Sequence, residues 1–399
     1  MTEAKKTVLF EKHAGLTGKA QIVPFAGWMM PLWYRSIAAE HSAVRKTAGL
    51  FDCTHMAVLK VIGKDAANFL NAVATNEISM LSPGKAQYSY LLTPAGDIID
   101  DIIIYYIDID NFMVVANASN EQKVKDWFNK VNAEKIGIDK NWQYKIIDLK
   151  DSTLPDAKVD IALQGPASAQ CIKNIFGVDV SVLKPLNFIQ LKDKGVDLII
   201  SRTGYTGAKI SFEIFVHPLK AIELWDLLLE KGKDLGVIPC GLGSRDSLRI
   251  EAGLPLYGHE LAGDFNISPF QAGYSWAVKM QKLGFIGKKA IAEKINYDTE
   301  IARLKFDGGK GIRPIRQFDG ILIDGRCIGY VLSCAGVNSE QIALALIEKK
   351  YNNNEQQIGV YYLARNQGHI QQGRKDKAVI GEKLDADIKG LVVERFEKF

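Results

Sequence analysis

The amino-acid sequence predicts an α+β protein that ends in an all-β domain, and two observations point to this class. Strand-like and helix-like segments are mixed over residues 1–295 without the regular alternation of a doubly wound sheet. Beyond residue 295 the pattern changes to short strand-like runs separated by turns. At roughly 150 residues per domain, a chain of 399 residues is long enough for two or three domains.

Periodicity and boundary residues predict the elements of the N-terminal part. Residues 36–49 have the spacing of an amphipathic helix, with Ser36 as N-cap and Gly49 as terminator. Residues 87–118 alternate strand-like runs with the turns TPAGD and DIDN, which predicts a β-meander.

Further along, two strand-like runs flank a glycine-rich connection, and two helices follow. The strands are expected at 196–202 and 211–216, and the helices at 218–231 and 244–252, each closed by a glycine. The C-terminal strands are expected within 320–334, 341–350 and 356–365.

The composition excludes several classes of protein. Apolar residues make up 47% of the chain and charged residues 24%, as in ordinary folded proteins. The net charge of +4 comes without a block of Lys or Arg, so no nucleic-acid partner is indicated. The longest apolar runs fall far short of the roughly 20 residues that cross a bilayer, and the N-terminus shows no targeting segment. We therefore expect a cytoplasmic protein with no membrane segment.

Cysteine and histidine spacing predicts neither disulfides nor a metal site. The five cysteines are odd in number and form no CxxC pair, which favours reduced thiols. The six histidines show no HxH or HxxxH spacing, and the cysteines do not complement them.

Two adjacent carboxylates, Asp100 and Asp101, interrupt an apolar strand-like run. Neighbours on a strand point to opposite faces, so at least one carboxylate is expected to face packed residues, with Asp101 on the side of Ile103 and Tyr105. A buried carboxyl must be hydrogen-bonded, paired or raised in pKa, and a raised pKa suits acid–base chemistry. The alternative is a strand that starts near a turn, with both side chains solvated or hydrogen-bonded to turn amides.

Other candidates lie in the second strand pair and the helix after it. Tyr205 stands between glycines, which suits either contact with a flat ligand or a simple hairpin. Glu213 lies in an apolar strand and is either a polar group of a cavity or an exposed residue. Arg245 and Arg249 are four residues apart on one helix face, where they can meet a ligand carboxylate or form structural ion pairs.

The order of ten short motifs resembles the glycine-cleavage T-protein (aminomethyltransferase) family over about residues 8–295, with a weaker match beyond. The motifs are LFEKHAGL, VPFAGWMMPLWY, EHSAVRKTAGLFDCTHM, GKAQYSYLLTPAGDIIDDIIIY, VVANASN, LQGPAS, SRTGYTG, FEIFV, GLGSRDSLRIEAGLPLYG and GYSWAVK.

The resemblance implies a three-domain cloverleaf around a central folate channel. Residues 1–295 would hold two interleaved α+β domains, and residues 296–399 a C-terminal β-barrel domain. The implied activity is transfer of a methylene unit from the aminomethyl-dihydrolipoyl arm of H-protein to tetrahydrofolate, with release of ammonia. Tetrahydrofolate is thus the implied co-substrate and lipoylated H-protein the implied partner.

The resemblance also assigns roles to residues at matching motif positions. Asp101 falls on the catalytic acidic residue of the family's IDD motif. The implied folate-binding residues are Met56, Tyr88, Tyr105, Asn117, Tyr205, Glu213, Arg245 and Trp276. Arg365 is a candidate for the family's late folate-contacting arginine.

The sequence departs from the family pattern after Tyr205, where GYTGAKISFE replaces GYTGEDGFE, so that Ala208 and Lys209 stand in place of an acidic pair. Two alternative functions follow. One is a tetrahydrofolate-dependent demethylase acting on a small N-, O- or S-methylated donor. The other, from a different class, is a non-catalytic folate-binding protein, which the lack of a KGCYxGQ motif at residues 284–289 disfavours.

Overall fold

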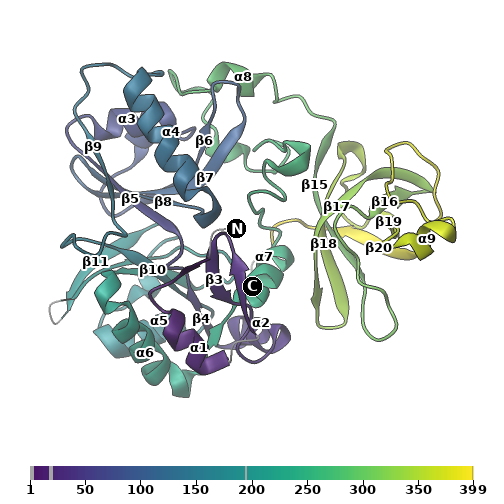
Figure 1. Ribbon diagram of the computed structural model, residues 1–399, viewed down its shortest axis with the longest axis horizontal. Helices are drawn as coiled ribbons and strands as arrows, with labels where there is room; N and C mark the ends of the chain where they lie inside the picture. Colours follow the sequence, from purple (N-terminus) through teal and green to yellow (C-terminus); the bar gives the residue numbers. More distant parts are fainter. Residues whose placement is uncertain (1–3, 18–20, 194–195, 398) are drawn as a thin grey trace. The chain divides into compact units, whose positions relative to one another are not determined.

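The computed structural model describes residues 4–17, 21–193, 196–397 and 399 (Figure 1). The chain forms two compact units, which are described separately. The first consists of Met1–Arg245 and Trp276–Ala292, and the second of Asp246–Ser275 and Glu293–Phe399. No helix in the described part of the chain is long and apolar enough to cross a membrane.

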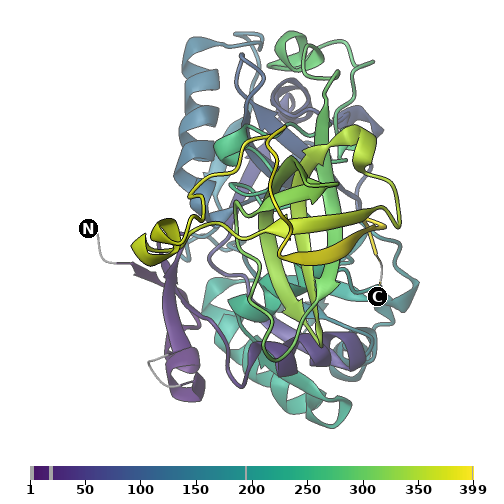
Figure 2. The same cartoon turned by 90° about the vertical axis from the view of Figure 1, so that its right-hand side faces the viewer.

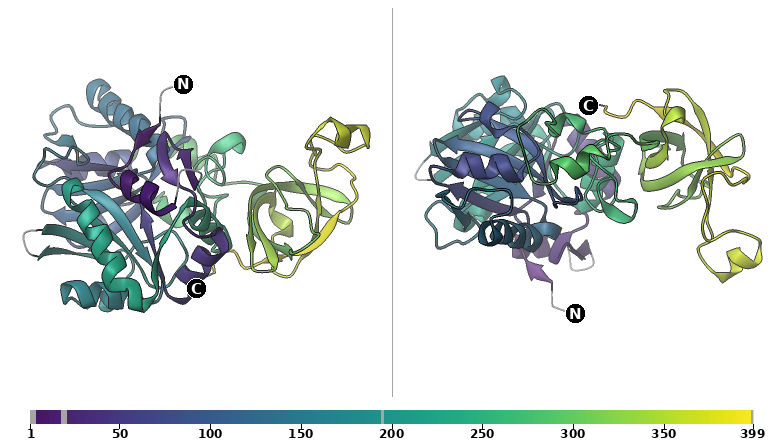
Figure 3. Two further views of the ribbon diagram at one scale, coloured as in Figure 1. Left: turned by 60° about the horizontal axis from the view of Figure 1, so that its bottom comes forward. Right: turned by 90° about the horizontal axis from the view of Figure 1, so that it is seen from above.

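A six-stranded sheet forms one layer of the first unit. All neighbouring strands are antiparallel except β14, which runs parallel to β4. Helices α5 and α6 cover one face, and Figure 3 shows the teal helix α6 lying across the strands. In sheet order the strands are β11 (Phe188–Asp193), β12 (Val196–Ser201), β13 (Ser211–Val216), β10 (Val159–Gln164), β4 (Ala48–Asp52) and β14 (Val237–Cys240), and the helices are α5 (Ser168–Phe176) and α6 (Ala221–Gly232).

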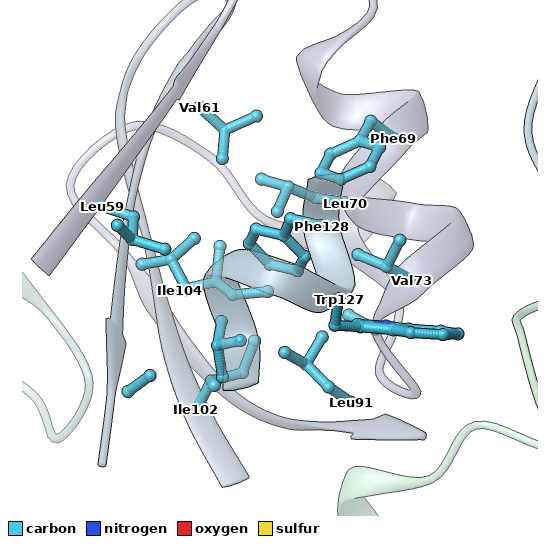
Figure 4. Packing of buried hydrophobic residues seen from close by; sticks show 14 of the residues in the cluster. Leu59, Val61, Phe69, Leu70, Val73, Leu91, Ile102, Ile104, Trp127 and Phe128 are labelled. Carbon is cyan, nitrogen blue, oxygen red and sulfur yellow. The ribbon is translucent and has the colours of Figure 1, made fainter. Parts of the chain in front are cut away.

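A five-stranded antiparallel sheet forms the second layer of this unit, with α3 and α4 on one face. Phe69, Leu70 and Phe128 of these helices pack against strand residues such as Leu59 and Ile104 (Figure 4). The strands in sheet order are β6 (Ala86–Leu92), β7 (Ile98–Asp108), β8 (Asn111–Ala116), β5 (Ala57–Ile62) and β9 (Lys145–Asp148), and the helices are α3 (Ala66–Val73) and α4 (Glu121–Glu134).

The faces of the two sheets that these helices leave uncovered contribute to one shared apolar cluster. Tyr105 and Met113 come from the five-stranded sheet, and Phe188, Ile199 and Phe215 come from the six-stranded sheet. Because strand side chains alternate between faces, each sheet packs against its helices on one side and joins this cluster on the other. Polar residues on the inner faces are therefore held next to buried apolar side chains.

Three short strands and the remaining helices complete the first unit. They are β1 (Lys5–Lys6), β3 (Trp28–Pro31) and β2 (Ile22–Phe25) in sheet order, with α1 (Phe10–Thr17), α2 (Ile37–Lys46) and α8 (Lys288–Ala292). Helix α7 (Leu242–Glu251) begins in this unit and continues into the second.

The second unit contains a closed six-stranded barrel, whose green to yellow strands face the viewer in Figure 2. In barrel order the strands are β15 (Thr299–Asp307), β18 (Glu340–Glu348), β17 (Arg326–Val337), β16 (Gly320–Ile323), β19 (Gln357–Tyr361) and β20 (Ile388–Val393), and α9 (Gln367–Gln371) lies between the last two along the chain. Alternating apolar residues such as Leu304, Ile321 and Val360 fill the barrel.

The predicted β-meander, the second strand pair and the C-terminal barrel are all present, and helix α2 has the predicted N-cap. Ser36 Oγ accepts a hydrogen bond of 3.2 Å from the Ala39 backbone N–H. The predicted terminator was wrong, because the helix ends at Lys46 and Gly49 lies inside β4. A Cβ on Gly49 would lie 2.6 Å from Cys240 Sγ and from a Val44 methyl, so glycine is needed there for strand packing rather than for a helix end.

Truncating Phe128 to alanine should lower the free energy of unfolding by about 3–5 kcal/mol, because the ring is fully buried and its removal leaves a cavity. Urea unfolding of the Phe128→Ala variant measures this change. As a control, Leu219→Ala removes a side chain that is 75% exposed and should change the free energy by less than about 0.5 kcal/mol. Similar losses in both variants would contradict the assigned core.

Candidate functional site

Strand β7 presents Asp100 and Asp101 to different surroundings. The Asp101 side chain lies on the face of Ile103 and Tyr105, which belongs to the cluster between the two sheets. Asp100 is fully buried, with no exposed surface, on the opposite face, where Ile102 packs against the helices. The solvated-turn alternative is therefore wrong for Asp100, and Asp101 is partly buried.

Asn117, at the end of β8, connects the two carboxyls. Its side-chain Nδ2 donates to Asp100 Oδ1 and to Asp101 Oδ1, each at 2.8 Å. Its backbone N–H donates to Asp100 Oδ2 at 2.9 Å. Asn120 Nδ2 adds a bond of 2.6 Å to Asp100 Oδ1, and Tyr88 Oη donates to Asp101 Oδ2 at 2.9 Å. The hydrogen bonds hold both carboxyl groups in defined orientations.

The pKa values of the two carboxyls are shifted upward. Burial, and then the charge of Asp101, raise the pKa of Asp100 to about 8 against the hydrogen bonds from Asn117 and Asn120. Burial also raises the pKa of Asp101, while the hydrogen bonds from Tyr88 and Asn117 oppose this shift. Two neighbouring carboxyls in a partly apolar site cannot both ionise easily, so the pair retains a proton well above the usual range for aspartate.

Aromatic rings border Asp101. The Tyr88 ring lies edge-on to Tyr90 at 5.3 Å between centroids and faces Trp276 at 5.7 Å with a tilt of 38°. Trp276 is 48% exposed, so part of its side chain is accessible. This arrangement places a flat apolar surface beside a carboxyl with a raised pKa.

Buried hydrogen bonds fix the segment that carries Trp276. Thr75 Oγ1 donates to the Ala277 carbonyl at 2.9 Å, and Lys282 Nζ donates to the carbonyls of Ala74 and Asn76, each at 2.8 Å. The Lys282 side chain is 3% exposed, and burial lowers its pKa to about 8.

Asn76 extends this set of bonds to strand β6. Its Nδ2 donates to the Tyr88 carbonyl at 2.8 Å, and its backbone N–H donates to Ser89 Oγ at 3.0 Å. The backbone positions of Tyr88 and Trp276 are thereby set by the same polar core.

Glu213 lies on the inner face of the six-stranded sheet and is 8% exposed, so the alternative of simple exposure was wrong. Its Oε2 accepts a hydrogen bond of 2.5 Å from Thr203 Oγ1 and one of 3.4 Å from Tyr105 Oη. Thr203 Oγ1 also forms a hydrogen bond of 3.1 Å with Ser201 Oγ, and Ser201 pairs with Glu213 across the sheet. Tyr105 thus connects the Asp101 strand to the Glu213 strand.

Arg245, near the start of α7, is the cation of this region. Its guanidinium lies 5.5 Å from the Tyr205 ring centroid and 5.8 Å from that of Phe51. Burial alone would lower the pKa of Arg245, but neighbouring acidic groups, led by Cys53 and Glu213, raise it above its usual value. Arg245 Nη1 is buried without a hydrogen-bond partner in the described part of the chain.

The second arginine of α7 has the structural role that the sequence left open. Arg249 is 1% exposed in the second unit and forms ion pairs with Asp246 at 2.8 Å and Glu260 at 2.7 Å. Arg365 also lies in the second unit, where it is paired with the buried Asp319. Met56 packs against the cluster that contains Tyr105.

The altered loop 204–210 is held by residues outside the substituted positions. Thr206 Oγ1 donates to Gln164 Oε1 at 2.9 Å, and Arg202 donates to the Lys209 backbone carbonyl at 3.1 Å. Lys209 itself is exposed. The replacement of an acidic pair by Ala208 and Lys209 therefore leaves the loop anchored.

Comparisons with known proteins decide the family. A sequence model of the GCVT N-terminal domain matches residues 10–282. A protein of Caldanaerobacter subterraneus subsp. tengcongensis named aminomethyltransferase is 38% identical over 364 residues, which cover 89% of this chain and 91% of that protein. The chain belongs to the glycine cleavage T-protein family. Another aminomethyltransferase, from Chlorobium limicola, is 37% identical over 92% of this chain and 97% of its own length.

The T-protein fold is also found in a solved structure. The crystal structure of glycine cleavage system aminomethyltransferase T from Bartonella henselae matches this chain with a TM-score of 0.79 at 28% identity and covers 99% of both chains. The predicted fold class, α+β with a C-terminal β-barrel, is confirmed for this chain.

Sequence reasoning missed several residues of the candidate site. Asn120 binds Asp100, Thr203 binds Glu213, and Lys282 anchors the Trp276 segment. Asp160 had a detectable signal, since it interrupts the apolar run VDIAL much as Asp100 and Asp101 interrupt theirs. The partners of Lys282 lie more than 200 positions away along the chain, and no local pattern reveals them.

The stability of the protein should depend less on pH after Asp100→Asn. A carboxyl whose pKa is raised on folding binds more protons in the folded state. The contribution of Asp100 to stability is therefore greatest below the unfolded pKa of about 3.9 and is lost as pH rises through the folded value of about 8. Urea unfolding at pH 5 and pH 8 should show a smaller loss for Asp100→Asn than for the unaltered protein.

The matched control is Asp108→Asn, which changes an exposed residue at the far end of β7. It should keep the pH-dependent loss of the unaltered protein. An undiminished loss in Asp100→Asn would show that the raised pKa of Asp100 does not contribute to stability.

Proposed function

We propose that this chain is the tetrahydrofolate-dependent aminomethyltransferase of a glycine cleavage system. It would take the methylene unit of the aminomethyl-dihydrolipoyl arm of H-protein, transfer it to tetrahydrofolate and release ammonia. Membership of the T-protein family supports the reaction class. The observation that carries the assignment of the catalytic residue is the raised pKa of Asp101, which accepts a hydrogen bond from Tyr88, whose ring in turn contacts Trp276.

The polar and aromatic groups of the first unit suit a folate. A pterin has N–H donors, acceptors and two flat faces, and the buried Glu213 carboxylate and the unpaired Arg245 Nη1 are complementary to such polar edges. Trp276 and Tyr205 offer ring faces for stacking. The proposed folate-binding residues remain Met56, Tyr88, Tyr105, Asn117, Tyr205, Glu213, Arg245 and Trp276.

Tetrahydrofolate supplies the nucleophilic nitrogen that accepts the one-carbon unit. Asp101 exchanges a proton with the reacting groups and stabilises the positive charge that develops near this nitrogen. With Oδ1 held by Asn117 and Oδ2 by Tyr88, the carboxyl has a defined direction. Its raised pKa lets it hold and exchange a proton at a higher pH than an ordinary aspartate does. When ionised, it would also stabilise a cationic methylene donor.

The two alternative functions are not favoured, since the relatives described above are named aminomethyltransferases. The lipoylated H-protein is proposed as the donor because the family acts within the glycine cleavage system. A division into two interleaved domains over 1–295 and a barrel domain over 296–399 stays part of the proposal.

Replacing Asp101 with asparagine should lower the rate of methylene transfer by about 10²–10⁴-fold, because the amide cannot exchange the proton. The assay follows ammonia release and 5,10-methylenetetrahydrofolate formation with aminomethyl-dihydrolipoyl H-protein. Titration with tetrahydrofolate should show that Asp101→Asn still binds the acceptor, since the hydrogen bond from Tyr88 or Asn117 to a side-chain oxygen is retained in part.

The exposed Asp108 on the same strand provides the comparison, and Asp108→Asn should keep the full rate. Full activity in Asp101→Asn with folate still bound would refute the catalytic assignment. If the unaltered protein instead forms methyltetrahydrofolate from small methylated donors and releases no ammonia, the demethylase alternative is correct.

A further inference from the structure

Asp160, on strand β10, is a buried carboxyl that the described part of the fold leaves incompletely bonded. The residue is 2% exposed, and its Oδ1 has no hydrogen-bond partner among the described residues. Buried polar groups are almost always paired, because an unpaired one loses its bonds to water and gains none in return. Such an atom in a well-packed sheet therefore requires an explanation.

The sheet register places Asp160 on the wall that carries Glu213. Asp160 pairs with Phe215 and Ala162 pairs with Glu213, so Asp160 and Glu213 point to the same face. Phe215 belongs to the apolar cluster between the two sheets. Asp160 therefore faces the interior of the unit, on the side where Tyr105 reaches Glu213.

Arg245 supplies the complementary charge on this wall. The Arg245 guanidinium lies 5.8 Å from the centroid of the Phe51 ring, and Phe51 pairs with Ala162, which pairs with Glu213 across the sheet. Burial is the largest cause of a pKa for Asp160 well above the usual value. A protonated Asp160 has one donor and one acceptor to offer.

Two unpaired polar atoms therefore occur in the same region, namely Asp160 Oδ1 and Arg245 Nη1. The Glu213 Oε2 atom, in contrast, is already bonded to Thr203 and Tyr105. A ligand whose edge alternates hydrogen-bond donors and acceptors would pair both atoms at once. An apolar ligand, or one with a single charge, would leave at least one of them unpaired.

We propose that Asp160 is a ligand-binding residue which, together with Glu213 and Arg245, binds the amino-oxo heterocycle of a pterin. The inference rests on the proposed function and adds Asp160 to the residues proposed there for binding the folate. The pterin has amino and ring N–H donors next to a carbonyl acceptor, which matches one carboxyl and one guanidinium. In the ligand-free protein the unpaired Asp160 lowers the free energy of unfolding, and ligand binding explains why a carboxyl occupies this position.

The substitution Asp160→Leu tests this proposal, because it removes both polar atoms with a modest change of size. The dissociation constants of tetrahydrofolate and of 6-methyltetrahydropterin, which lacks the benzoylglutamate part, should rise by the same factor of about 10–100. The Tm of the ligand-free protein should rise by about 2–4 °C, since an unpaired buried group is removed. Calorimetric titration and thermal unfolding measure the two effects.

The control is Asp197→Asn on β12 of the same sheet, where the side chain is exposed, and it should change neither quantity. If Asp160→Leu does not fold, Asp160→Asn tests the proposal instead, with a smaller expected loss of affinity for both ligands.

Unchanged affinity would overturn the proposal. A lowered Tm without loss of affinity would also overturn it, because that result indicates a structural role. A loss confined to tetrahydrofolate would overturn the pterin assignment, whereas failure of the unaltered protein to bind either ligand would refute the proposed function as well.

Discussion

The alternation of side chains along strand β7 is the constraint on which the candidate site depends. Because successive residues point to opposite faces, Asp100 and Asp101 cannot share one environment, although they are adjacent in the chain. Asp100 is buried among apolar residues on the face that the helices cover, and Asp101 accepts a hydrogen bond from Tyr88 on the inner face. Asn117 donates to both and so connects the two faces of the sheet at the strand end.

Burial gives these carboxyls their chemistry. In a medium of low polarity an ionised carboxyl is disfavoured, and a second carboxyl nearby disfavours it further. Hydrogen bonds from Asn117, Asn120 and Tyr88 offset part of this effect and fix the direction of each oxygen. The pair can therefore hold a proton near neutral pH without losing its orientation, as a residue that directs proton transfer requires.

A second group of buried, hydrogen-bonded polar residues lies on the six-stranded sheet. Glu213 is bonded to Thr203 and Tyr105, and Arg245 provides the positive charge among several buried acids. Tyr105 belongs to the strand of Asp101 and reaches the strand of Glu213, so packing of the two sheets against one apolar cluster sets the spacing of both groups. Arg249, only one helical turn beyond Arg245, is instead fully engaged in ion pairs of the second unit.

The sequence alone predicted the local elements and identified polar residues that stand in apolar segments. The β-meander, the strand pair around Tyr205, the Ser36 cap and the C-terminal barrel strands follow from periodicity and turn residues, and Asp101 and Glu213 were identified as carboxylates inside apolar strands. Only the tertiary structure showed that Asp100 is fully buried, that Gly49 is needed for strand packing and that Lys282 fixes the segment of Trp276 by hydrogen bonds. These outcomes depend on contacts between residues far apart in the chain. Whether a polar group is buried, paired or left unpaired is a property of its neighbours in space, which local periodicity does not encode.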